Sequence, residues 1–157
     1  MQKGSRVLAT LLICLTLFNF FSSCNSSSKF SGKTGKFLVG PIRITGYVVS
    51  SSTLILKDQQ GNNASYIRVN RNQPINWVVT KSDLQIIDIA PDPKYPGNEP
   101  TFFSALPHQQ GDPKHWQATV GYPDSTKGFV EEYFIKWKRD GDDSTYTYDP
   151  LMQLNPK

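Results

Sequence analysis

Cysteine, methionine and histidine are scarce in this sequence of 157 residues, and each occurs only twice. Both cysteines, Cys14 and Cys24, lie within the first 24 residues, so the rest of the chain has no thiol. If the chain is cut before Cys24 and modified on that thiol, it keeps neither a free cysteine nor a disulfide. This excludes a thiol nucleophile, an iron–sulfur cluster and a cysteine-ligated zinc site from the mature protein.

Local catalytic motifs are also missing. The sequence contains no G-x-S-x-G serine elbow, P-loop, G-x-G-x-x-G loop or H-E-x-x-H metal motif. Glu131 and Glu132 are adjacent on a predicted strand, where successive side chains point to opposite faces. They therefore cannot flank one bond as the paired carboxylates of a glycosidase do. We expect a protein that is not an enzyme and has no cofactor.

A strong excess of either charge is absent as well. The chain has 17 basic and 13 acidic residues, for a net charge of +4. Residues 1–23 contain Lys3 and Arg6 and no acidic residue, so the chain without them has a net charge of only +2. The densest basic cluster, at residues 136–139, is followed directly by Asp140, Asp142 and Asp143. We interpret it as a solvated strand end and expect no nucleic-acid partner.

An apolar run near the N-terminus, residues 7–21, follows Lys3 and Arg6. A membrane-spanning helix needs roughly 20 apolar residues, whereas the core of a signal peptide has about 7–15. The run therefore predicts a signal peptide. It ends at Ser22 and Ser23, two small residues that suit the pocket of a signal peptidase, and Cys24 follows at once.

The tetrapeptide Phe-Ser-Ser-Cys at residues 21–24 resembles the lipobox of bacterial lipoproteins, which usually carries an aliphatic residue in place of Phe21. The resemblance implies cleavage before Cys24 and acylation of its thiol. Two or three acyl chains would hold the protein on a membrane, because one chain alone binds only marginally. We therefore expect a protein anchored in the bacterial cell envelope. Its domain would lie in the periplasm or at the cell surface, and Asn25 favours the outer membrane.

Serine, glycine and lysine dominate residues 25–36, with one aromatic side chain. Such a composition buries too little apolar surface to offset chain entropy, so we predict a flexible tether. The predicted organisation is a signal peptide over residues 1–23, a lipidated tether over 24–36 and one folded domain over 37–157.

Short β-type runs separated by turn residues make up most of the predicted domain. No segment has helical periodicity over 11 or so residues. We therefore predict an all-β fold, a single antiparallel β-sandwich of seven or eight strands, with the three tryptophans in its core. We expect the continuously apolar run at 84–90 to be buried on both faces. The predicted strands cover residues 42–49, 53–57, 65–69, 74–80, 84–90, 115–120, 130–138 and 151–154.

The order of IRVNRNQPINWVV, LQIIDI, EEYFIKW and YDPLMQLNP over residues 42–156 resembles a cupredoxin-like or immunoglobulin-like sandwich. The copper chemistry of cupredoxins is not implied. A blue-copper centre needs two histidines, a cysteine thiolate and usually a methionine. After Cys24 the chain has no cysteine and offers only His108, His115 and Met152.

The exception to the strand pattern is the proline-rich segment 91–114, which we predict to be a long loop with at most a short strand or helical turn within it. A loop of this length in a compact domain is usually functional or mobile. We therefore place the candidate binding surface there, with the partner an envelope protein, a glycan or a small ligand. The candidate binding residues are Tyr95, Phe102, Phe103, His108 and His115.

Two alternatives to a non-catalytic binding protein remain open. His108, Asp112 and His115 offer three potential ligands for a divalent metal, so a metal-binding protein or metal-dependent hydrolase is one alternative. The other is a structural subunit that assembles by pairing its sheet edges. The acidic stretch 140–149 matches a calcium loop poorly, because its glycine is at the second position and no glutamate ends it. We interpret it as a polar hairpin tip.

Overall fold

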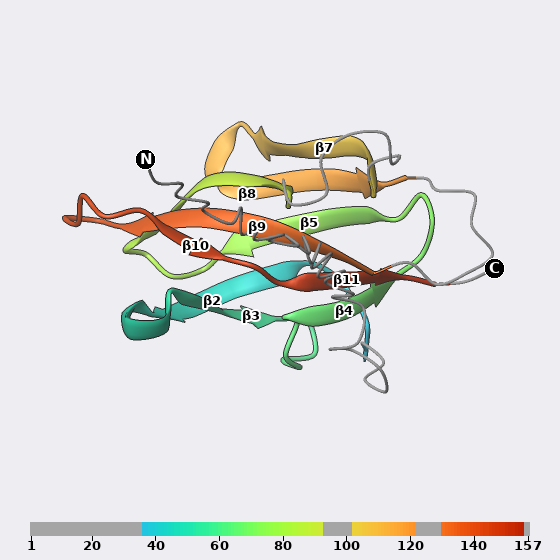
Figure 1. The fold of residues 1–157 in the computed structure, drawn as a ribbon, viewed down its shortest axis with the longest axis horizontal. Helices are drawn as coiled ribbons and strands as arrows, with labels where there is room; N and C mark the ends of the chain where they lie inside the picture. The colour runs from blue at the N-terminus through green and yellow to red at the C-terminus, as the bar shows by residue number, and fades with distance from the viewer. Residues whose placement is uncertain (1–35, 93–101, 122–129, 156–157) are drawn as a thin grey trace, which may run out of the picture. The chain divides into compact units, whose positions relative to one another are not determined.

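The computed structural model describes residues 36–92, 102–121 and 130–155, which form two β-sheets (Figure 1). A short 3-10 helix, η2 (Val49–Ser51), links the second strand to the third. The strands are β1 (Lys36–Phe37), β2 (Ile42–Val48), β3 (Thr53–Lys57), β4 (Tyr66–Val69), β5 (Pro74–Val79), β6 (Leu84–Pro91), β7 (Phe103–Gln110), β8 (Asp112–Val120), β9 (Val130–Arg139), β10 (Tyr146–Tyr148) and β11 (Leu151–Leu154).

Sheet A is built around β9, its longest strand. Along one side β9 pairs antiparallel with β6. Along the other side it pairs first with β11 and then with β10. Beyond β11 the sheet continues through β4 to β1. Sheet B has the simpler order β3-β2-β5-β8-β7.

Both sheets are mixed, which corrects the prediction of a purely antiparallel sandwich. β4 runs parallel to both of its neighbours, β1 and β11, and β2 runs parallel to β5. Alternating side chains reveal which face of a strand is buried but carry no information about the direction of its neighbour. The sequence pattern therefore predicted the strands without predicting these parallel pairings.

One hydrophobic core lies between the two sheets. Trp77 of β5 and Tyr133 of β9 are both fully buried, and their ring centroids are 5.8 Å apart. The Trp77 indole Nε1 donates a hydrogen bond of 3.3 Å to the Tyr133 hydroxyl, which satisfies two polar groups that burial would otherwise leave without partners. Trp137 of β9 and Trp116 of β8 are also buried, as the sequence predicted.

Several predicted strands are confirmed to within a residue or two. The predicted runs at 42–49, 53–57, 65–69, 74–80, 84–90, 130–138 and 151–154 correspond to β2, β3, β4, β5, β6, β9 and β11. β2 and β3 pair antiparallel as a hairpin, and Ser52 adopts the left-handed conformation that ends η2.

The prediction of a loop over 91–114 is wrong where the structure describes that segment. Pro91 ends β6, and β7 and β8 form an antiparallel hairpin whose turn contains Gly111 at φ 63°. β7 escaped prediction because most of its side chains are exposed, so its sequence shows no alternation. It also contains Pro107, which an edge strand tolerates because its outward N–H groups pair with no neighbouring strand.

The prediction that 84–90 is buried on both faces is wrong as well. β6 pairs only with β9, and its burial alternates along Leu84, Gln85 and Ile86. The register then shifts between Ile86 and Asp88, and Ile87 is 44% exposed. The continuous apolar run therefore reflects a β-bulge on an edge strand, where one extra residue interrupts the alternation.

Candidate functional site

Two candidate binding residues, Phe102 and Phe103, belong to the core. They are 1% and 2% exposed. The Phe103 ring packs edge-to-face against Tyr133, with centroids 6.4 Å apart and an interplanar angle of 88°. These two rings therefore hold the β7 end of sheet B against sheet A and do not offer a binding surface. Tyr95 lies outside the described residues.

The two candidate histidines lie on the β7–β8 hairpin, and both are exposed. His115 Nδ1 is 3.1 Å from Asp112 Oδ2. His108 has other partners, since its Nδ1 is 3.0 Å from the Leu106 carbonyl and its Nε2 is 2.7 Å from Gln110 Nε2.

The structure therefore pairs Asp112 with His115 and does not bring His108 into the same group. Within residues 36–92, 102–121 and 130–155, no three histidine, cysteine, aspartate or glutamate side chains come together as a metal site would require. A metal-dependent hydrolase built on His108, Asp112 and His115 thus has no preformed ligand set in the described part of the chain.

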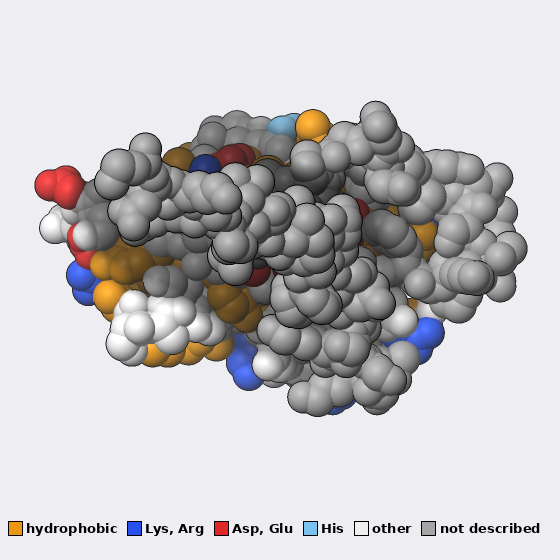
Figure 2. Space-filling model, viewed as in Figure 1, with side chains coloured by type: hydrophobic (Ala, Val, Ile, Leu, Met, Phe, Trp, Pro, Cys, Tyr) orange, Lys and Arg blue, Asp and Glu red, His pale blue; other side chains and the backbone are white. Residues whose placement is uncertain are grey.

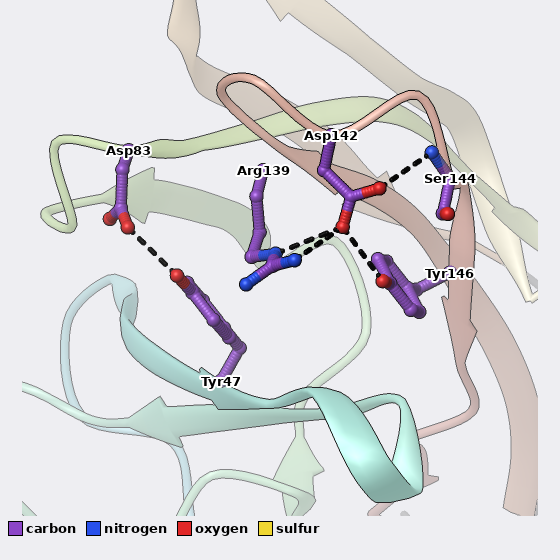
Figure 3. Close-up of polar contacts among 6 residues, drawn as sticks. All are labelled: Tyr47, Asp83, Arg139, Asp142, Ser144 and Tyr146. Carbon is purple, nitrogen blue, oxygen red and sulfur yellow. Dashed lines mark hydrogen bonds and ion pairs between the residues drawn. The ribbon is translucent and has the colours of Figure 1, made fainter.

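A different cluster, which sequence reasoning missed, lies where the β9–β10 turn meets the end of β2 (Figure 3). Asp142 is its centre. Its Oδ2 accepts hydrogen bonds from Arg139 Nη2 at 2.6 Å, Arg139 Nε at 3.1 Å and the Tyr146 hydroxyl at 2.9 Å. Its Oδ1 accepts one from the Ser144 backbone N–H at 2.9 Å. These donors, Arg139 first, hold the pKa of Asp142 far below its ordinary value.

The other half of this cluster involves sheet B. The Tyr47 hydroxyl on β2 donates a 2.7 Å hydrogen bond to Asp83, which also forms an ion pair with Lys81 at 3.2 Å. The hydrogen bond to Asp83 raises the pKa of Tyr47, because ionised Tyr47 would face a second negative charge. The Arg139 guanidinium lies 6.0 Å from the centre of the Tyr47 ring and so connects the two halves.

Three aromatic rings of this region contact one another in a chain, with a tilted pair and a stacked pair. Trp137 lies between Tyr47, with ring centroids 5.2 Å apart, and Tyr146, with centroids 4.5 Å apart and planes 26° from parallel. Trp137 is fully buried, whereas the two tyrosines are half-buried. Figure 2 shows hydrophobic side chains next to acidic and basic ones at the end of the domain that carries the β9–β10 turn.

The chemistry of this cluster is that of a rigid junction between the sheets. It contains carboxylates, phenols and a guanidinium that are bonded to one another, Ser144 joins it through its backbone N–H, and no cysteine or histidine is among the six residues drawn in Figure 3. The calcium-loop alternative for 140–149 also finds no support, because Arg139 occupies the Asp142 oxygen that a cation would need. Gly141, at φ 75°, forms the polar hairpin tip that the sequence predicted.

Among the residues that the structure describes, Glu131 is the one carboxyl group with a strongly shifted pKa and no cation as its partner. It lies on β9 two residues before the buried Tyr133, so it faces the space between the sheets. Its Oε2 accepts a 3.1 Å hydrogen bond from the Phe102 backbone N–H. Partial burial raises the pKa of Glu131 to about 7, and the bond from Phe102 opposes that rise.

A scan against known protein families finds no match, and a search of curated proteins finds no significantly similar sequence. Among the described residues, no helix combines the length and the apolar character needed to cross a membrane.

Proposed function

We propose that this chain is a lipid-anchored, non-catalytic protein of the bacterial cell envelope. The observation that carries the proposal is the sequence of residues 7–24, in which an apolar run, two small residues and Cys24 follow one another as in a lipobox. The position of the folded part supports it, because the first described strand begins at Lys36, the last residue of the predicted tether. The cluster around Asp142 supports a structural role, because its polar groups bond to one another.

Acylation is tested by expressing the full chain in a bacterial host supplied with an alkyne-labelled palmitate. The wild-type protein should carry the label on a mature form that begins at position 24. Cys24→Ser should lose it. Cys14→Ser is the matched control and should keep it, because Cys14 lies in the segment that is removed. An unmodified thiol at Cys24, or a mature chain that starts elsewhere, would refute the anchor.

For the domain itself, we propose a sandwich of the cupredoxin-like or immunoglobulin-like type without a copper centre. The support is two sheets around one core, with Trp77 and Tyr133 in contact across it. Titration with Cu²⁺ should produce no intense visible absorption of the copper–thiolate kind, because the mature chain has no thiolate to supply. Such a band in the acylated protein would contradict this proposal.

We place the partner-binding surface, for an envelope protein, a glycan or a small ligand, on the exposed side of the β7–β8 hairpin. Leu106 on β7 is 56% exposed, the highest value among the large hydrophobic side chains described. Leu106→Ser should therefore reduce cross-linking to a partner in intact cells. Ile55→Ser, at a 41% exposed position on β3, is the matched control. Equal cross-linking by both variants would refute the β7–β8 hairpin as the partner-binding surface.

A further inference from the structure

The two outer faces of the sandwich differ in character. On sheet A, the outward positions include three aromatic rings, those of Phe37, Tyr66 and Phe134. On sheet B, the outward positions of the three central strands carry no phenylalanine, tyrosine or tryptophan. They include Arg43, Thr45 and the 45% exposed Val48 on β2, Asn76 and Val78 on β5, and His115, Gln117 and Thr119 on β8.

Exposed apolar side chains gather where the chain enters sheet A. Phe37 of β1 is 48% exposed, and Val39, two residues further on, is 38% exposed. The strand pairing places Phe37, Arg68, Gln153 and Val130 on one continuous row across β1, β4, β11 and β9. Val130, at the other end of this row, is also 38% exposed. We call this row with Val39 the β1-side face.

A cation lies among these apolar groups. The Arg68 guanidinium carbon is 4.6 Å from the centre of the Phe37 ring, and Arg68 Nη2 donates a 2.6 Å hydrogen bond to Asn155. Aromatic rings next to arginine are typical of surfaces that lie at the level of lipid headgroups, where the ring meets the acyl boundary and the cation meets phosphate.

The short connection between Cys24 and β1 indicates that the β1-side face would lie near the membrane. Between Cys24 and Lys36 there are only residues 25–35. Fully extended, that connection spans at most about 40 Å, and as a flexible coil its ends average about 20 Å apart. An acylated Cys24 would therefore keep β1, and with it Phe37, close to the bilayer.

We propose that the β1-side face of sheet A docks on the phospholipid surface, with Phe37 and Val39 at the acyl boundary and Arg68 on a lipid phosphate. The proposal rests on the anchor at Cys24 and adds the orientation of the domain: sheet A lies against the membrane, and sheet B faces away from it. The partner surface on β7 is then on the sheet that stays accessible.

Site-directed spin labelling tests this orientation in the acylated protein, reconstituted in vesicles of phosphatidylethanolamine and phosphatidylglycerol. The mature chain has no other free thiol, so Val130→Cys labels the β1-side face and Thr45→Cys labels the outer face of sheet B. The label at 130 should be relaxed more by lipid-soluble oxygen than by a water-soluble nickel chelate. The label at 45 should show the reverse.

A second set of variants tests the named apolar residues. Phe37→Ser with Val39→Ser should return the label at 130 to water-like accessibility, whereas Ile55→Ser on sheet B should leave it unchanged. Circular dichroism confirms that each variant is folded. Equal accessibility at 45 and 130 in the acylated protein would overturn the docking face alone.

Two other results would also overturn it. Shielding of the label at 130 from both relaxants, in detergent as in vesicles, would mean that the chain itself covers the face. Absence of acyl mass at Cys24 would refute the anchor, and the docking face would fall with it.

Discussion

Glu131 should make the stability of this domain fall as the pH rises through neutrality. The group is partly buried between the sheets, and its pKa is raised from the ordinary 4.5 to about 7. Between these two values the folded protein holds a proton that the unfolded chain has released. The free energy of unfolding therefore decreases with increasing pH in this window. The stabilisation is fully present below pH 4.5 and is lost above pH 7.

The size of the effect follows from the same two values. A displacement from 4.5 to about 7 corresponds to an upper bound of about 3 kcal/mol. Because the carboxyl group is only partly buried, solvent screening reduces the expected effect to about 1–2 kcal/mol. Glu131→Gln should remove it, since the amide carries no charge while its oxygen still accepts the hydrogen bond from the Phe102 N–H.

The assay is urea unfolding monitored by tryptophan fluorescence. It is repeated between pH 5 and pH 8, the range that brackets the raised pKa of Glu131. Trp77 and Trp137 are fully buried and should report global unfolding. Wild type and Glu131→Gln should have similar stabilities at the acid end, and the variant should be the more stable at the alkaline end. Glu132→Gln is the matched control on the same strand and should keep the wild-type slope. If Glu131→Gln also keeps that slope, the reasoning is refuted.

Three further predictions concern the core, a close backbone contact and the β9–β10 turn. Tyr133→Phe removes the acceptor of the Trp77 indole N–H and should cost about 1–3 kcal/mol of unfolding free energy in urea, because a buried donor is left unsatisfied; an unchanged midpoint would contradict this. Gly121→Ala should destabilise the domain by about 1–3 kcal/mol. Its new Cβ would lie only 2.7 Å from the Cα of Ser104. A melting temperature equal to that of the wild type would contradict this prediction. Asp142 has a lowered pKa, so its contribution to stability is present at neutral pH and is lost as the pH falls through the folded-state value. Asp142→Asn should therefore speed amide hydrogen exchange in the turn at neutral pH, and unchanged exchange would refute its central role.

Much of the strand layout could be predicted because the burial alternates. In β5 the residues Ile75, Trp77 and Val79 are buried while Asn76 is only half-buried, and this is the period that the sequence displays. β7 could not be predicted this way, because an edge strand whose side chains are mostly exposed has no apolar period. β1 and β10 have only two and three residues, too few for any period to be recognised.

The candidate site was harder to predict than the strands. The polar, proline-rich neighbours of Phe102 and Phe103 in the sequence indicate a binding loop, yet both side chains belong to the core. The contact between Tyr47 and Asp83 joins residues 36 positions apart, so no local motif could indicate it. Only the pair of Arg139 and Asp142, three residues apart in a polar turn, left a signal that sequence reasoning could have used.

The position of β4 has a consequence for how the chain folds as it is synthesised. This strand, which lies next to the edge of sheet A, forms its ladders with β1 on one side and β11 on the other, so the first and last described strands meet on it. Sheet A therefore cannot be completed until residues 151–154 have left the ribosome. Pairing between strands that are far apart in the sequence forms slowly, so we expect sheet A to fold late. Under the export proposed above, the chain would reach the export channel with sheet A still open.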